Sequence, residues 1–146
     1  ITYKIVTQVP TDEALELYIE AGWWTDEWPA DGIPDLVAGS FKFAAAFNES
    51  GKLIGTARAI SDGVSDAYIQ DVVVASAYRK QGIGSYLIRM LIDELQAAGV
   101  DWIGLIGKPG TAKFYESLGF IAVGEPYLED DIPHIEMLRT RVGGTG

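Results

Sequence analysis

A glycine-bearing turn between an apolar run and an amphipathic segment constrains this chain more than any other feature. The run at 72–75 is Val-Val-Val-Ala, which is typical of a buried strand. From Ile83 to Ala98 apolar residues recur at three-, four- and five-residue steps, which predicts a helix with one apolar face. The turn between strand and helix reads Tyr78-Arg79-Lys80-Gln81-Gly82-Ile83-Gly84-Ser85.

The start of this helix is a candidate anion-binding site. Free N–H groups at a helix start and the positive end of its dipole favour an anion, most often a phosphate. Glycine at 82 and 84 lets a ligand approach the main chain without meeting a Cβ, and Arg79 and Lys80 add positive charge. We therefore predict a phosphate cradle at residues 79–85. The alternative is a tight turn with two solvated cations.

Two other phosphate-binding motifs do not fit the turn. A dinucleotide-binding turn needs a third glycine, where this chain has Leu87. A nucleotide P-loop needs Gly-Lys followed by serine or threonine. The two Gly-Lys pairs of this chain, at 51–52 and 107–108, are followed by Leu53 and Pro109.

The residues Arg79-x-x-Gly82-x-Gly84 resemble the R/Q-x-x-G-x-G/A signature of the GNAT superfamily of acyl-CoA N-acyltransferases. Residues 114–120, Phe-Tyr-Glu-Ser-Leu-Gly-Phe, are similar to the helix and turn that follow later in that family. A strand-like run at 101–106 separates the two elements, which are in the family's order. The resemblance covers about residues 1–140.

The order of expected elements predicts the fold class. Strand, helices, three antiparallel strands, helix, strand, helix and two strands imply an α/β (mixed α+β) single domain at 1–146, with 142–146 frayed. We expect a mixed, mostly antiparallel sheet of about six or seven strands flanked by about four helices. The resemblance implies that the strand before the cradle and the strand after its helix splay apart. The pantetheine arm of the cofactor would lie between them, near Val72 and Val74.

Simple alternation predicts which strand residues share a face. Apolar residues at every second position from Phe41 to Phe47 predict a half-buried strand. Gln70 and Asp71 are neighbours on the strand 67–74, so alternation puts them on opposite faces.

The resemblance implies acetyl-CoA as the cofactor. Lys108 stands where many relatives have an asparagine that bonds the pantetheine, so either Lys108 reaches a phosphate or that contact is lost. The candidate cofactor-binding residues are Val72, Val73, Val74, Arg79, Lys80, Gln81, Gly82, Ile83, Gly84, Ser85 and Lys108.

Direct transfer to an amine needs a base, an oxyanion donor and an acid. Free amines titrate at about pH 10, so the acceptor arrives protonated and must lose a proton. Asp71 is the carboxylate in the interior of its strand and is the candidate base; a water chain, or a purely structural role for Asp71, is the alternative. The N–H of Val73 or Val74 would stabilise the oxyanion. Tyr115 matches the family's tyrosine and is the candidate acid for the thiolate; its alternative is packing by the ring.

The acceptor side is less defined by the sequence. Trp23 and Trp24 lie in a stretch with turn residues, and the resemblance implies that this stretch forms one wall of the acceptor pocket. The alternative is that they cover the edge of the core. Tyr68 and Gln70 complete the candidate substrate-binding residues.

The composition favours some classes of binding partner over others. The net charge of −10 disfavours nucleic acid and gives mild support for a small cationic amine as substrate; the alternative is that the charge serves solubility alone. Without cysteine there is no disulfide or cysteine acyl-enzyme, and the lone His134 predicts no metal site. No membrane-length apolar run or signal-peptide pattern is present, so we expect a cytoplasmic protein that does not bind membranes. The resemblance adds a possible homodimer.

The leading hypothesis is an N-acetyltransferase that moves an acetyl group from acetyl-CoA directly to a small amine in a ternary complex. Two alternatives are a catalytically weak acyl-CoA-binding sensor and a protein or peptide N-acetyltransferase. Because bulky tryptophans favour a closed pocket, the sequence favours a small-molecule acceptor.

Overall fold

The computed structural model describes residues 1–25, 27–107, 112–129 and 132–140. Side chains are described throughout these ranges except at 106, 107, 112, 122–129, 132–136 and 140. The predicted cofactor contact of Lys108 and the frayed end at 142–146 therefore lie outside the described residues.

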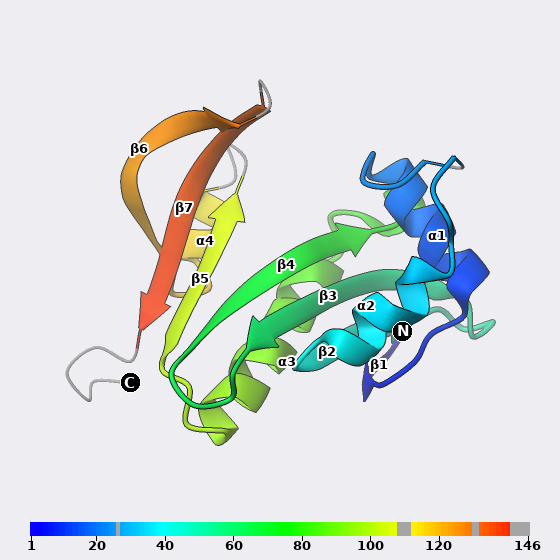
Figure 1. The fold of residues 1–146 in the computed structure, drawn as a ribbon, viewed down its shortest axis with the longest axis horizontal. Helices are drawn as coiled ribbons and strands as arrows, with labels where there is room; N and C mark the ends of the chain where they lie inside the picture. The colour runs from blue at the N-terminus through cyan, green and yellow to red at the C-terminus, as the bar shows by residue number, and fades with distance from the viewer. Residues whose placement is uncertain (26, 108–111, 130–131, 141–146) are drawn as a thin grey trace.

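One mixed sheet of seven strands forms the centre of the molecule, in the order β1-β2-β3-β4-β5-β7-β6 (Figure 1). Every neighbouring pair is antiparallel except β4 and β5, which are parallel. The expected sheet of six or seven strands is confirmed. The strands are β1 Thr2–Val6, β2 Lys42–Phe47, β3 Leu53–Ser61, β4 Asp66–Val74, β5 Trp102–Gly107, β6 Ile121–Glu129 and β7 Ile132–Thr140.

Helices cover both faces of this sheet. In the view of Figure 1, α1 and α2 lie in front of the sheet and α3 and α4 lie behind it. A short 3-10 turn, η1, joins β4 to the cradle. Among the described residues no helix is long and apolar enough to cross a membrane. The helices are α1 Thr11–Glu20, α2 Gly32–Gly39, η1 Ser76–Tyr78, α3 Ile83–Ala97 and α4 Ala112–Glu116.

Strand β2 contributes to two hydrophobic cores, one on each face of the sheet. Phe43 and Ala45 pack with α1 and α2, whereas Ala44 and Ala46 pack with α3. All four side chains are buried. The expectation of a half-buried strand at 41–47 is therefore wrong, because β2 lies inside the sheet with helices on both faces.

Strands β4 and β5 separate soon after they begin. Only Asp66–Tyr68 of β4 pairs with Trp102–Gly104 of β5, while β4 continues beside β3 as far as Val74. Strand β5 instead pairs along its length with β7. Figure 1 shows β4 and β5 diverging. The splayed central strands implied by the family resemblance are confirmed.

Strand β4 contains a bulge next to this separation. Arg58 of β3 lies opposite Gln70, and Thr56 lies opposite Val73, so β4 holds one residue more than β3 over the same length. The extra residue bends the strand at Asp71, whose φ of +56° lies in the left-handed region.

The bulge changes which side chains share a face. Before it, Ala67 and Ile69 pack into the core under α3. After it, Val72 and Val74 pack against that same core, and Val73 packs with α1 and α2. Period-two alternation across the whole strand would have given the opposite assignment.

Helix α3 is the main element behind the sheet. Its apolar stripe faces β2, β3 and β4, as the sequence periodicity predicted. It ends before Gly99, which has a φ of +88°. The buried residues of the stripe are Ile83, Leu87, Ile88, Leu91, Ile92 and Leu95.

Replacing Leu87 by alanine should lower the free energy of unfolding by about 2 to 5 kcal/mol, because it leaves a cavity in a closely packed core. Leu87 is fully buried, and a Cβ added at Gly55 would lie 3.2 Å from its Cδ1. Urea denaturation followed by circular dichroism measures the change. The exposed Arg89 on the same helix provides the control, and Arg89→Ala should change stability by no more than about 0.5 kcal/mol. Equal effects would contradict the packing described.

Candidate functional site

A groove of about 370 Å³ lies at the start of α3, beside the far end of β4. It brings together eight of the predicted cofactor-binding residues and adds two aromatic residues that the sequence analysis missed, Tyr78 and Phe114. The lining residues are Val72, Val74, Tyr78, Arg79, Lys80, Gly82, Ile83, Gly84, Ser85 and Phe114.

The main chain of the cradle is open to a ligand. Within the part of the chain that the structure describes, no side chain caps α3, whose N-cap is Gly82 with a φ of +82°. A Cβ added at Gly82 would meet no atom within 4 Å, and one at Gly84 would stand 3.8 Å from Val74 and 4.0 Å from Phe114, in the wall of the groove. Lys80 also has a positive φ, of 62°. An uncapped helix start with glycines facing a groove is suited to an anion.

Val73 and Gln81, two other predicted cofactor residues, lie outside the groove lining, and Arg79 lines the groove while it makes contacts within the chain. Val73 points to the opposite face of the sheet, into the core under α1 and α2. Gln81 is exposed and is not part of the groove lining. The guanidinium of Arg79 donates from Nε to the Val74 carbonyl (3.1 Å) and lies 3.6 Å from the carboxylate of Glu20.

Asp71 lies on the α1 and α2 face of the sheet, where it accepts a hydrogen bond from Arg58 Nε at 2.6 Å. Gln70 lies opposite Arg58 in the strand pairing and therefore shares that face. The expectation that Gln70 and Asp71 point to opposite faces is wrong, because the bulge at Asp71 interrupts the alternation. Asp71 is thus a carboxylate paired with a cation, at the bend of the strand.

Tyr18 of α1 packs beside this ion pair and is only 2% exposed. Burial, and secondly the charge of Asp71, raise the pKa of Tyr18 to about 12, although the nearby Thr56 hydroxyl and Arg58 act in the opposite direction. The hydroxyls of Tyr18 and Thr56 lie near each other, but neither has a hydrogen-bond partner of good geometry among the described residues. Buried hydroxyls without partners are uncommon, and they mark this cluster as a candidate for water or substrate contact.

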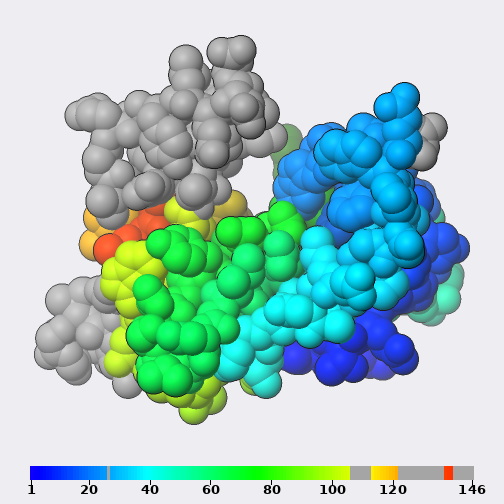
Figure 2. Space-filling view, in the orientation of Figure 1, coloured from blue at the N-terminus to red at the C-terminus, as the bar shows by residue number. Residues whose placement is uncertain are grey.

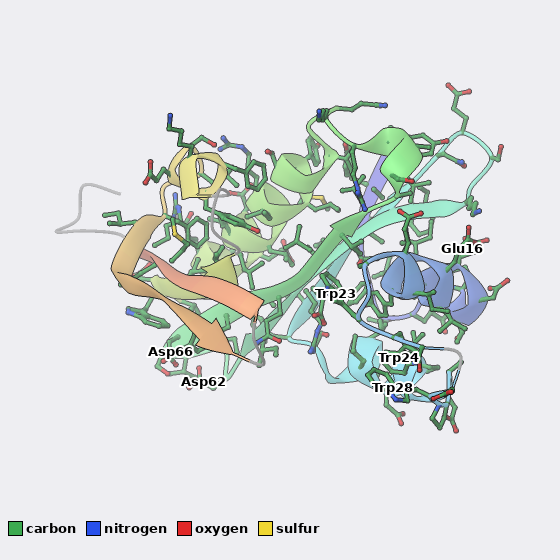
Figure 3. The ribbon with its side chains drawn as sticks, turned by 90° about the horizontal axis from the view of Figure 1, so that it is seen from above. Glu16, Trp23, Trp24, Trp28, Asp62 and Asp66 are labelled. Carbon is green, nitrogen blue, oxygen red and sulfur yellow. The ribbon has the colours of Figure 1, made fainter. Side chains whose placement is uncertain are left out.

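The tryptophans after α1 continue this cluster outward. The ring centre of Tyr18 lies 5.9 Å from that of Trp23 and 6.2 Å from that of Trp24. The ring centres of Trp24 and Trp28 are 5.9 Å apart. In Figure 3, Trp23 points toward the strands, whereas Trp24 and Trp28 lie beside α2. The surface is hollowed between this loop and β4 (Figure 2). Trp24 is partly buried against the core, as the core-edge alternative expects, while 36% of Trp23 is exposed. A role of these tryptophans as a wall of the acceptor pocket stays a prediction.

Tyr68 lies at the other end of β4. It packs edge-on against Trp102 with ring centres 5.4 Å apart, where β4 and β5 are still paired. Its ring is 43% exposed. It is therefore separated along β4 from the bulge at Asp71 by two residues of the strand, Ile69 and Gln70.

Tyr115 belongs to α4 and is half-buried against the core under α3. Its ring makes edge contacts with Phe114 and Phe120, at 4.9 and 6.1 Å between ring centres. Burial raises the pKa of Tyr115, which keeps the hydroxyl protonated, as a proton donor requires. Phe114, its neighbour, lines the groove. The assignment of Tyr115 as the acid stays a prediction.

The sequence analysis missed Arg58, Thr56 and Tyr18. Arg58 alone carried a signal, since it is a cation in the middle of the apolar strand 53–61. The hydroxyls carried none, because tyrosine and threonine are ordinary in such elements. Among the described residues, no group of three or more His, Cys, Asp or Glu side chains could hold a metal ion.

Tyr18→Phe should reduce the loss of stability at high pH. The pKa of Tyr18 is raised from 10.0 to about 12 in the folded protein, so its contribution is complete below pH 10 and is lost as the pH rises through about 12. This loss amounts to roughly 2 to 3 kcal/mol. Urea denaturation of both proteins over that pH range measures it. The same decline in the variant and the original chain would contradict the buried environment of the hydroxyl.

Sequence comparison identifies relatives of this chain. The model of the acetyltransferase (GNAT) domain family matches residues 30–141. An uncharacterized N-acetyltransferase of Gracilaria tenuistipitata var. liui is 36% identical over 110 residues, which are 73% of this chain and 60% of that protein. The chain spans between 39% and 60% of the length of the first three curated relatives that it matches.

Solved structures show the same fold. An aminoglycoside 6'-N-acetyltransferase complexed with coenzyme A superposes with a TM-score of 0.79, covering 97% of this chain and 98% of that one at 21% identity. An acyl-CoA N-acyltransferase from Pseudomonas aeruginosa superposes with a TM-score of 0.74, covering 96% and 100% at 25% identity. The likeness at 21% identity establishes the fold alone.

Proposed function

Because the chain belongs to the GNAT acetyltransferase family, whose enzymes use acetyl-CoA, we propose that it transfers the acetyl group to the amino group of a small cationic amine. The observation that carries the proposal is the uncapped start of α3, which opens into a groove where β4 has parted from β5. A diphosphate at the helix start would place the rest of the cofactor along that groove.

The residues present fit coenzyme A. Main-chain N–H groups at the start of α3, where glycines stand at 82 and 84, would hold the diphosphate, and Lys80 would add charge. Val72 and Val74 supply an apolar wall for the pantetheine arm, with Phe114 across the groove. Beyond Tyr68, the edge of β4 that no described strand pairs with supplies main-chain groups for an extended arm.

The chemistry requires three tasks of this chain. Acetyl-CoA, when bound, supplies an activated thioester carbonyl. The N–H of Val73 or Val74 would donate to the carbonyl oxygen as negative charge develops there. The carboxylate of Asp71 would take the proton of the amine, either directly or through a water chain that passes the Tyr18 and Thr56 hydroxyls. The hydroxyl of Tyr115 would give a proton to the leaving thiolate.

The two faces of β4 support a ternary complex. Val72 and Val74 face the cofactor groove, whereas Asp71 and its neighbours lie on the α1 and α2 face, below the tryptophan loop. An amine entering on the second face would reach the thioester at the bend of the strand. The chain contains no cysteine that could carry the acetyl group covalently, and direct transfer needs no such group.

The acceptor class follows from charge and shape. The net charge of −10 attracts cations to the molecule. The exposed faces of Trp23 and Trp28 favour an ammonium group or an apolar substituent near it. Release of free thiol from acetyl-CoA, measured over a panel of amines and peptides, tests the proposal. Turnover with small cationic amines supports it; coenzyme A binding without turnover, or turnover with peptides only, would overturn it.

Gly82→Glu should abolish binding of coenzyme A, because a carboxylate would occupy the place of the diphosphate. Gly99→Glu is the matched control: both glycines have a positive φ, flank the same helix, and have no atom within 4 Å of an added Cβ. Both variants should lose similar stability, and only Gly82→Glu should lose binding. Isothermal calorimetry with coenzyme A measures the difference. Retained binding in Gly82→Glu would remove the cradle from the proposal.

Tyr115→Phe should lower turnover by about 100-fold or more, the usual contribution of a positioned proton donor. It should leave the affinity for coenzyme A nearly unchanged, because the ring and its packing remain. Tyr3→Phe removes the hydroxyl of a β1 ring that stacks on Tyr86 and does not line the groove, so this control should keep full turnover. Steady-state kinetics compare the variants. Full turnover in Tyr115→Phe would show that another group supplies the proton.

A further inference from the structure

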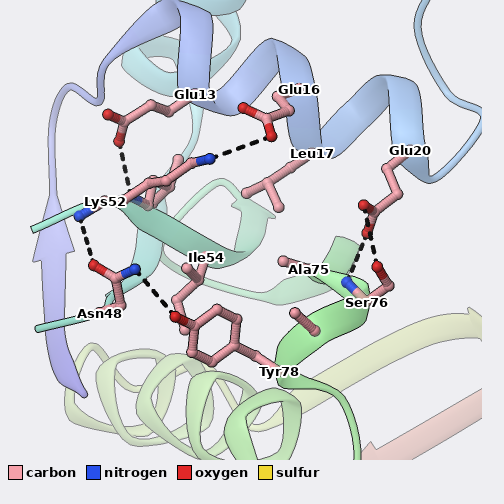
Figure 4. Close-up of a pocket in the computed structure, with 12 residues that line it drawn as sticks. Glu13, Glu16, Leu17, Glu20, Asn48, Lys52, Ile54, Ala75, Ser76 and Tyr78 are labelled. Atoms are coloured by element: carbon pink, nitrogen blue, oxygen red, sulfur yellow. Dashed lines mark hydrogen bonds and ion pairs between the residues drawn. The ribbon is translucent and has the colours of Figure 1, made fainter. Parts of the chain in front are cut away.

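Glu20 connects the last turn of α1 to the segment that precedes the phosphate cradle. Its Oε1 accepts a hydrogen bond from the main-chain N–H of Ser76 at 2.7 Å, and its Oε2 accepts one from the Ser76 hydroxyl at 3.4 Å (Figure 4). The same carboxylate lies 3.6 Å from Arg79 Nη2. Glu20 therefore holds both ends of the turn η1, which leads from β4 into the cradle.

Two nitrogens of the Arg79 guanidinium are engaged by contacts within the chain. Its Nε donates to the carbonyl of Val74, the last residue of β4, and its terminal nitrogen faces Glu20. The guanidinium thus joins three segments of chain: the end of β4, the turn and α1. Only the remaining donors of the side chain are available to the groove that it lines.

We propose that Glu20 is a positioning residue for cofactor binding: it fixes Ser76 and Arg79, so that the main chain of the cradle is held open for the diphosphate. Arg79 then has a structural role, in which its contacts with Val74 and Glu20 hold the turn in place. The main-chain N–H groups of the cradle, with Lys80, bind the anion. The inference rests on the proposed function, since it concerns the same cofactor site.

Whether removal of Glu20 weakens or tightens binding of coenzyme A distinguishes a positioning role from a purely electrostatic one. Glu20 is an anion near a site for a diphosphate, so its charge alone weakens binding of coenzyme A. Removing that charge, and releasing Arg79, would tighten binding if charge were all that mattered. If Glu20 positions the cradle, its removal weakens binding instead.

Glu16 provides a matched control. It lies one helical turn before Glu20 on α1, and the two carboxylates line one pocket of about 260 Å³ (Figure 4). Glu16 pairs with Lys52 at 3.2 Å, on the hairpin between β2 and β3, and has no contact with Ser76 or Arg79 among the interactions described. Glu16→Ala therefore removes the same charge from the same helix face without touching the turn.

Calorimetry with coenzyme A on the full chain tests the inference. Glu20→Ala should raise the dissociation constant about tenfold, the usual effect of losing a hydrogen bond to a charged group, while Glu16→Ala should leave it within about twofold or lower it. Unchanged or tighter binding in Glu20→Ala would overturn the proposal. If the original chain does not bind coenzyme A, the proposed function itself fails, which is a different result.

Two further measurements exclude a loss of stability as the cause. In steady-state kinetics Glu20→Ala should raise KM for acetyl-CoA and leave kcat at saturating cofactor within about twofold, with a Tm like that of Glu16→Ala. The double variant Glu20→Ala with Arg79→Gln should bind coenzyme A no more weakly than Glu20→Ala alone, because both changes disrupt the same set of contacts around the turn. Additive losses would instead identify Arg79 as an independent phosphate ligand and contradict the proposal.

Discussion

Strand β4 pairs with β3 over nearly its whole length but shares only Asp66–Tyr68 with β5. Beyond that point none of the described strands pairs with that edge of β4. Main-chain donors and acceptors in such a place need partners, and a ligand with an extended amide arm can supply them. The groove at Val72 and Val74 and the open start of α3 both lie along this edge. The separation of two strands therefore creates the site.

The bulge at Asp71 determines which side chains of β4 face the groove and which face α1 and α2. By adding one residue, it directs Val72 and Val74 to the groove, while Asp71 and Val73 face α1 and α2. The contacts of Glu20 with Ser76 and Arg79 then tie α1 to the turn after β4. The helix that carries the tryptophan loop and the turn that opens the cradle are thus held as one unit.

The sequence predicted the elements whose signals are local. The strand at 67–74 and the helix from Ile83 were each predicted to within one or two residues, because a continuous apolar run and helical spacing are present in the segments themselves. The half-buried strand at 41–47 and the opposite faces of Gln70 and Asp71 were wrong. Alternation describes a regular strand with one covered face, and it contains no information about a second layer of helices or an inserted residue.

The sequence by itself determined the glycine-bearing turn and the start of α3, since the glycines, the cations and the helix start are contiguous in the chain and need only local geometry. The tertiary structure decided what stands around it. Glu20 and Ser76 are 56 residues apart, and Arg58 and Asp71 are 13 apart on two strands whose register depends on the bulge. Contacts of this kind form only when helices cover the sheet and fix its strands. Sequence spacing could not predict which residues make these contacts, because the packing of helices and strands brings the partners together and their separation along the chain does not.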